Sequence, residues 1–236
     1  MVWQPKDPPP GEQGSRTIQL PYLNRFESIW EYEKAFLADR IDFFSYIGPT
    51  CPICGTLHCY RQITPYWRYA IELFPCFKKK RVPIARFVCR RDRVTFSLLP
   101  IQLIPYLQYT AVAVIGALLL GYKCWQMGQR GFFGAMIVLD PYSNVTAWLI
   151  VCWLQLVLRG FRRAHPVLGR FYDLSGLRSS ERGLAWEEVA GYILAFGWKP
   201  DIAWVPLLFK LLHLYSRQTR QFLFGTASQQ RLSNSY

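Results

Sequence analysis

Two cysteines in the run Cys51-Pro-Ile-Cys54-Gly55 are the residues of this chain best suited to chemistry. Their thiolates can point at one metal ion, and the glycine permits the tight backbone turn that a zinc knuckle needs. A zinc ribbon requires a second pair of ligands some tens of residues later, and Cys89 and Asp92 stand at that distance. We therefore predict one zinc ion bound by Cys51, Cys54, Cys89 and Asp92.

Other ligand sets and other uses of the cysteine pair remain open. Zinc accepts an Asp oxygen, but softer ligands are commoner in structural sites, so His58, Cys59 and Cys76 are reserve ligands. A degenerate ribbon could also keep its fold without metal. A redox role is the weakest alternative, because no thioredoxin-like βαβ pattern surrounds the pair.

The cysteine count and the N-terminus indicate where such a site would work. Seven cysteines leave one over in any disulfide framework. Residues 1–10 are polar and proline-rich, without the basic region and apolar core of a secretory signal. We therefore expect an intracellular, reducing location, cytoplasmic and nucleoid-associated in a prokaryote, where paired cysteines are first interpreted as metal ligands.

The segment that the predicted ligands enclose is strongly basic. The chain has 28 Lys and Arg against 15 Asp and Glu, a formal charge of +13, and ten of the basic residues occur from Arg61 to Arg93. Such a surface favours polyanions, meaning nucleic acid or an anionic membrane. The alternative is a solvated basic hairpin. Tyr66, Trp67 and Tyr69 could stack on single-stranded bases, although packing against the ribbon is favoured. We predict that DNA phosphates are bound by Lys78, Lys79, Lys80, Arg81, Arg86, Arg90, Arg91 and Arg93.

Hydrophobic patterning predicts an α+β chain, in which a small zinc-ribbon-like β module is followed by a mostly α-helical domain. Short β-type runs at 58–63, 84–88 and 94–98 flank the basic stretch. The units that we predict along the chain are a flexible arm at 1–20, an N-terminal helix at 21–48, the zinc-ribbon-like basic module at 49–100, a helical domain that a helix-turn-helix could occupy at 101–175, C-terminal helices at 176–217 and a disordered tail at 218–236.

Part of this pattern is similar to known proteins. The motifs that carry the similarity are Cys51-Pro-x-Cys54-Gly, Arg86-Phe-x-Cys89, Thr95-Phe-Ser-Leu-Leu-Pro100 and Pro105-Tyr. They resemble the N-terminal zinc-ribbon module of insertion-sequence transposition proteins, and a family of short, functionally uncharacterised zinc-ribbon proteins encoded in transposon contexts. The resemblance is specific over 51–110 and loose over 111–165. In those families a second Cys-x-x-Cys knuckle precedes a helix-turn-helix region, whereas this chain has Asp92 at the fourth position. The resemblance implies DNA binding.

Two apolar helices are predicted, Tyr106–Tyr122 and Val145–Leu158, and three uses for them are open. The second could be the recognition helix of a helix-turn-helix, with Ser143, Asn144 and Thr146 near its start. Its long apolar centre leaves little to contact bases, so a core helix, or one on which a transposase or other protein docks, is favoured. Membrane association is the weaker alternative, because the clean apolar run of about 17 residues is near the lower limit for a span.

Catalysis is not expected. His58, His165 and His213 are scattered along the chain without a matched nucleophile or acid partner. A three-carboxylate transposase core would need a dedicated domain beyond the ribbon. The sequence therefore predicts a non-catalytic DNA-binding protein, an accessory or regulatory factor in transposition. The alternative is a helical partner-binding subunit of a larger complex, or a membrane-associated protein.

Overall fold

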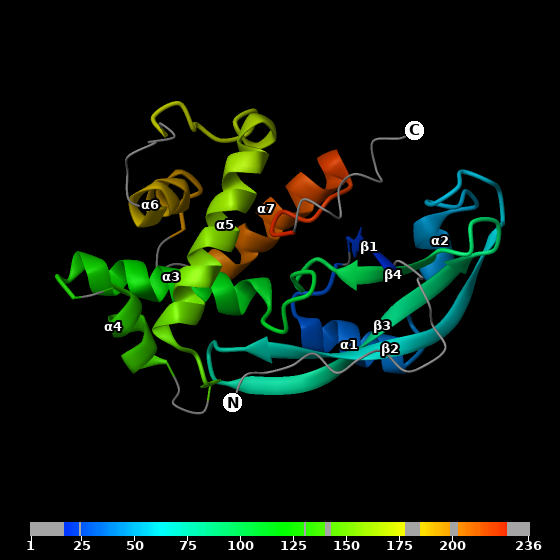
Figure 1. The fold of residues 1–236 in the computed structure, drawn as a ribbon, viewed down its shortest axis with the longest axis horizontal. Helices are drawn as coiled ribbons and strands as arrows, with labels where there is room; N and C mark the ends of the chain where they lie inside the picture. The colour runs from blue at the N-terminus through cyan, green and yellow to red at the C-terminus, as the bar shows by residue number, and fades with distance from the viewer. Residues whose placement is uncertain are drawn as a thin grey trace.

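The fold has a sheet-containing part that is followed by a helical part (Figure 1). The computed structural model describes residues 17–23, 25–129, 131–139, 143–177, 185–198 and 203–225. A four-stranded sheet and two short helices come first in the chain, and the later elements are all helices. The α+β prediction is therefore confirmed. The predicted arm up to residue 16 and the predicted tail from residue 226 lie outside the described residues.

A long antiparallel hairpin is the largest element of the sheet. Strands β2 (Tyr60–Glu72) and β3 (Lys78–Cys89) form it, and β4 (Thr95–Pro100) pairs antiparallel with β3. Strand β1 (Thr17–Tyr22) pairs parallel with β4, which gives the order β1-β4-β3-β2. The hairpin is much longer than the apolar runs predicted, because the basic and aromatic residues between those runs continue the same hydrogen-bonded ladder.

Two short helices cover the sheet with an aromatic core. Helix α1 (Ile29–Leu37) begins at Ser28, whose Oγ accepts a hydrogen bond from the Glu31 backbone N–H at 3.2 Å, and α2 is Phe43–Ile47. The predicted helix at 21–48 is thus two helices. Phe87 of β3 stacks on Phe96 of β4, with ring centroids 5.3 Å apart, and both rings are fully buried. This packing fixes the end of the hairpin that carries the cysteines.

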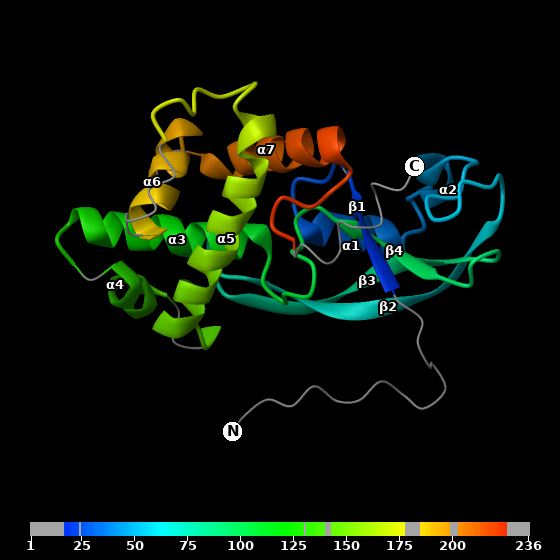
Figure 2. The same ribbon diagram turned by 45° about the horizontal axis from the view of Figure 1, so that its top comes forward.

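The helical part is arranged around α3 (Ala111–Gln126), which is buried on almost every side. The other helices of this part are α4 (Gly131–Val138), α5 (Ala147–Leu168), α6 (Ala185–Ala195) and α7 (Trp204–Thr219), and α6 packs on α5. Figures 1 and 2 show α5 crossing α3, with α4 and α6 on opposite sides of α3. Among the described residues, every helix is too short or too polar to cross a membrane.

Both ends of the described chain are packed where the sequence predicted an arm and a tail. Residues 17–20 belong to β1. Phe222, Leu223 and Phe224 are buried, and the Arg163 guanidinium donates to the carbonyls of 222, 223 and 225 at 3.3, 2.7 and 3.0 Å. Three consecutive buried apolar side chains, and a half-buried cation that bonds three carbonyls of the segment, explain why it is packed beyond α7.

Candidate metal centre

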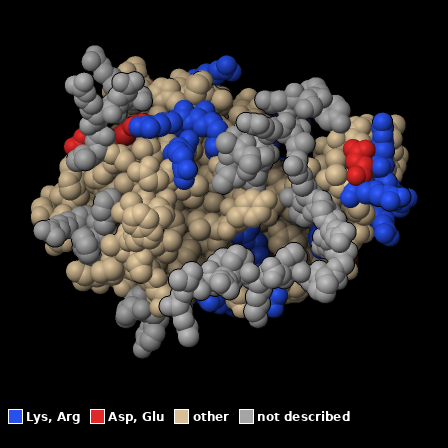
Figure 3. Space-filling view, in the orientation of Figure 1, with Lys and Arg blue, Asp and Glu red and all other residues tan. Residues whose placement is uncertain are grey.

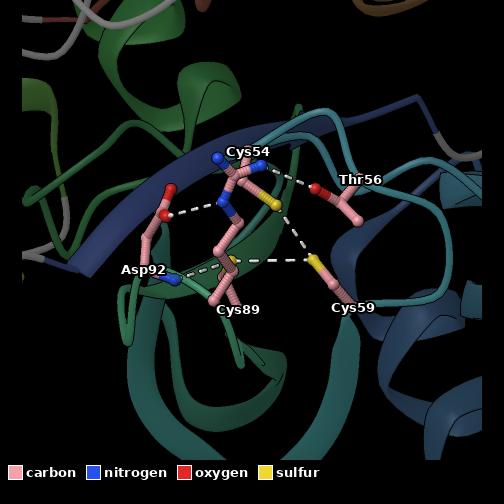
Figure 4. Close-up of polar contacts among 6 residues, drawn as sticks. Cys54, Thr56, Cys59, Cys89 and Asp92 are labelled. Carbon is pink, nitrogen blue, oxygen red and sulfur yellow. Dashed lines mark hydrogen bonds and ion pairs between the residues drawn. The ribbon is translucent and has the colours of Figure 1, made fainter.

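Four cysteine sulfur atoms converge at one end of the β2–β3 hairpin. The Sγ atoms of Cys51, Cys54, Cys59 and Cys89 all lie within 4.8 Å of one another. The Sγ of Cys59 is 3.0 Å from that of Cys54 and 3.7 Å from that of Cys89 (Figure 4). Four thiolates about 2.3 Å from one zinc ion would have Sγ atoms about 3.8 Å apart, so the cluster has the dimensions of a tetrahedral site. These four cysteines could hold a metal ion.

The first two ligands are placed by a tight turn. The Gly55 backbone N–H donates to the Cys51 carbonyl at 3.0 Å, and the Cys51 N–H donates to the Thr56 carbonyl at 3.0 Å. Gly55 has φ +70°, a left-handed conformation that glycine adopts without strain. The turn directs both thiols of the Cys-x-x-Cys pair toward the same side, as the sequence predicted.

The other two ligands are placed by the register of the hairpin. Tyr60, the first residue of β2, is directly opposite Cys89, the last residue of β3. Cys59 immediately precedes Tyr60, and its carbonyl accepts a hydrogen bond from the Arg90 N–H at 2.8 Å. Strand pairing therefore brings Cys59 beside Cys89, although the two are far apart along the chain.

The predicted Asp92 ligand is not supported. Its carboxylate lies outside the cluster, 4.0 Å from the Arg91 Nε, and its side chain is exposed. Its backbone N–H instead donates to the Cys89 Sγ at 3.4 Å, so the residue supports a ligand without being one (Figure 4). Cys59, a reserve ligand in the sequence analysis, occupies the fourth corner. The spacing of residues along the chain favoured Asp92. Spacing gives the separation in sequence, but it does not give the register between strands, which brings Cys59 beside Cys89.

The remaining reserve ligands are not part of the site. His58 follows the first turn with φ +51°, is exposed and belongs to no potential metal-binding group among the described residues. Cys76 is exposed in the loop that joins β2 to β3, at the other end of the hairpin. The signal for the correct fourth ligand was present in the sequence, since Cys59 directly precedes the aromatic and polar run that becomes β2.

Hydrogen bonding divides the protons of the cluster unequally. The hydrogen bond between Cys54 and Cys59 lowers the pKa of Cys54 to about 6 and raises the pKa of Cys59. Burial raises the pKa of Cys89. At neutral pH the cluster thus combines a ready thiolate with thiols that keep their protons, and a metal cation would take the place of those protons.

The predicted phosphate ligands form two groups at opposite ends of β3. Lys78, Lys79, Lys80 and Arg81 begin the strand, whereas Arg90, Arg91 and Arg93 follow its end, beside the cysteines. At about 3.3 Å per residue, Arg90 is about 30 Å from Arg81 and about 40 Å from Lys78 along the strand. Figure 3 shows Lys and Arg gathered at the right-hand end of the molecule, the end that carries α2 in Figure 1. Arg86 lies between the groups and is half-buried.

The second basic group is tied to the first cysteine turn. Arg91 Nη1 donates to the Thr56 hydroxyl at 3.0 Å, which links the turn after β3 to the Cys51–Cys54 turn (Figure 4). Arg90, Arg91 and Arg93 are all exposed, and Asp92 is the acidic residue among them. A metal that joins the two turns would therefore hold exposed cations in a fixed place.

The helix considered for base recognition uses its first polar residues for capping. The Thr146 hydroxyl accepts from the Leu149 N–H at 3.2 Å, and Ser143 is buried, with its hydroxyl accepting from the Val145 N–H at 3.4 Å. A recognition helix needs such residues to reach base edges. The start of α5 therefore offers less for base contacts than its sequence indicated.

Comparison with known proteins adds no relative from which a function could be transferred. No family model, curated protein or solved structure matches this chain.

Proposed function

We propose that this chain is a non-catalytic DNA-binding protein that acts on the nucleoid as an accessory or regulatory factor in transposition. The observation that carries the proposal is the position of three exposed arginines, Arg90, Arg91 and Arg93, directly beside a four-cysteine cluster. A turn that a metal ion already holds in place loses little further conformational entropy when its arginines bind phosphates. The motifs at 51–110 that resemble insertion-sequence proteins support the role in transposition.

Zinc is the metal that we propose for the cluster. Four thiolates in a tetrahedral arrangement suit zinc, which has no geometric preference from d-electrons and binds sulfur strongly. Among the proposed ligands, Cys51 and Cys89 are buried, and the other two are half-buried, so the site is closed as structural zinc sites are. The role of the ion is to hold two turns together, with Cys51, Cys54 and Cys59 on one side and Cys89 on the other.

The spacing of the basic groups favours a contact with duplex DNA along one helical turn. Along β3, Arg90 is about 30 Å from Arg81 and about 40 Å from Lys78, distances that bracket the repeat of about 34 to 36 Å after which a duplex presents the same groove again. Phosphate contacts give affinity without a choice of sequence. We therefore propose that this surface positions the protein on DNA, and that sequence selection in transposition comes from elsewhere in the complex.

A salt titration of duplex binding tests the proposal. If the eight basic residues named from the sequence contact phosphates, the logarithm of affinity should fall with the logarithm of salt concentration with a slope of about −7. Removing the metal with a chelator should weaken binding and make the slope shallower. A slope near zero, or a slope that chelation leaves unchanged, would contradict a metal-positioned phosphate surface.

A partner-binding subunit is the second candidate, and one surface favours it. Ile137 and Val138 at the end of α4, and Trp148 at the start of α5, are 77%, 62% and 75% exposed. Large apolar side chains exposed together mark interaction sites. Co-purification with the transposase of the same mobile element is the test, and Trp148→Glu should abolish it without changing DNA affinity.

A further inference from the structure

One face of the β2–β3 hairpin carries two exposed aromatic rings. Trp67 and Tyr69 are two positions apart on β2, so they point to the same side of the strand. Their side chains are 44% and 41% exposed. Across the ladder Trp67 is opposite Pro83, and Tyr69 is opposite Arg81. This face of the hairpin therefore presents aromatic rings from β2 beside a cationic side chain from β3.

Two cations stand over one of these rings. Lys79 Nζ is 4.8 Å from the centre of the Tyr69 ring, and the guanidinium carbon of Arg81 is 6.0 Å from it. The neighbouring residues of the same run, Lys78 and Lys80, instead lie over the ring of Trp30, at 4.2 and 5.9 Å. Strand alternation thus divides the basic run into two pairs. Lys79 and Arg81 share the side of the exposed aromatics.

The tip of the hairpin is not available to enter a DNA groove. Phe74, in the loop after β2, lies so close to Gly116 of α3 that a Cβ on that glycine would be 2.5 Å from the Phe74 ring. The Ile71 N–H donates to the Gln108 carbonyl at 2.9 Å, which holds the end of β2 against the loop before α3. A free two-stranded ribbon can lie in the major groove, but this one is docked at its tip. Contacts with nucleic acid here must come from its exposed face.

The third aromatic residue of this segment does not belong to that face. Tyr66 packs against the core of the sheet-containing part, and burial raises its pKa. It lies next to Trp67 in the strand and therefore on the opposite side. Of the three residues that could stack on bases according to the sequence, the structure leaves Trp67 and Tyr69 accessible.

We infer that the face formed by Trp67, Tyr69, Lys79 and Arg81, here called the ribbon face, binds unpaired DNA. This inference rests on the proposed DNA-binding function and adds the strandedness of one of its sites. Bases stack on the two rings, which every base can do, while the cations contact the phosphates. The rings are about 7 Å apart along β2, roughly twice the 3.4 Å rise of stacked bases, so the face fits a strand drawn out of its helical stack.

Competition between two probes tests the ribbon face in the full-length, metal-loaded protein. The probes are a labelled twelve-nucleotide oligo(dT), which forms no duplex, and a labelled duplex of twelve base pairs, and fluorescence anisotropy measures both at one salt concentration. In the double variant Trp67→Ala, Tyr69→Ala the charge is unchanged. We expect its affinity for oligo(dT) to fall about tenfold or more, and its affinity for the duplex to change less than about twofold.

Two controls separate stacking from a loss of folding. Trp67→Phe with Tyr69→Phe keeps a ring at each position and should retain oligo(dT) binding to within about threefold. Trp148→Ala removes an exposed ring that belongs to α5 and not to the ribbon face, and should change neither affinity. Equal losses on both probes in the alanine variant, or no loss on either, would overturn the inference. If the unaltered protein binds the duplex but not oligo(dT), the inference fails and the proposed function stands, whereas binding of neither probe overturns both.

Discussion

The Sγ of Cys59 lies 3.7 Å from the Sγ of Cys89 because Cys59 directly precedes the residue that pairs with Cys89 across the hairpin. This relationship completes the four-cysteine cluster and makes the metal site depend on strand pairing. The ladder and the site should therefore form together, since each places groups that the other needs.

The ligand set can be checked by metal content. Cys59→Ser should abolish stoichiometric zinc, because a hydroxyl replaces one of four thiolates, whereas Asp92→Ala should retain about one zinc per chain. Mass spectrometry of the elements in reduced, chelator-free protein measures both variants. His58→Ala, which removes an exposed neighbour, is the matched control. Zinc lost from Asp92→Ala and kept in Cys59→Ser would restore the carboxylate as the fourth ligand.

Zinc binding should release protons at neutral pH. The pKa of Cys54 is lowered to about 6 by its hydrogen bond with Cys59, so at neutral pH this group is mostly thiolate. The pKa of Cys59 is raised by the same bond and that of Cys89 by burial, so these thiols still carry theirs. A weakly buffered titration with a pH indicator at pH 7 should detect their release. Affinity should fall as the pH falls, more steeply below about pH 6, where Cys54 also binds a proton. Zinc uptake without any proton release would contradict this division.

The two basic groups should make separate contributions to the salt dependence of duplex binding. Replacing Lys78, Lys79, Lys80 and Arg81 by Gln should reduce the slope by about 3.6, and replacing Arg90, Arg91 and Arg93 should reduce it by about 2.7. The losses should be equal for unrelated sequences, because phosphates carry no sequence information. Zinc content is the control for the second variant, since Arg91 is bonded to Thr56. An unchanged slope would identify that group as a solvated surface.

The docked hairpin tip predicts a coupled effect on stability. Gly116→Ala should lower the free energy of unfolding by about 1 to 3 kcal/mol, because its Cβ would meet the Phe74 ring at 2.5 Å. Denaturant unfolding measures this change. In a Phe74→Leu background the same substitution should cost less, since the smaller side chain leaves room. Equal costs in the two backgrounds would show that the Phe74 ring is not the source of the loss.

The sequence was sufficient for the parts of the site that depend on local chemistry. The Cys-x-x-Cys spacing and the following glycine predicted the first turn, and Cys89 was identified from its distance along the chain. The spacing placed Asp92 ahead of Cys59, and this order was wrong, because the choice depends on the register between β2 and β3, which a bulge between Ile63 and Tyr66 also alters. Hydrophobic alternation identified short strands, and it missed the basic half of the hairpin, where aromatic rings and cations replace apolar side chains.

The parallel pairing of β1 with β4 also sets an order of events during synthesis. Thr17 of β1 pairs with Thr95 of β4, so the N-terminal strand has no partner until the whole hairpin has left the ribosome. At about 5 to 20 residues per second the intervening chain takes about 4 to 16 seconds to make. During that interval the side chains of Leu20 and Tyr22 lack the β4 strand against which they pair in the folded protein. Brief protease pulses during translation should cut near β1 early and fail to cut there once β4 has emerged.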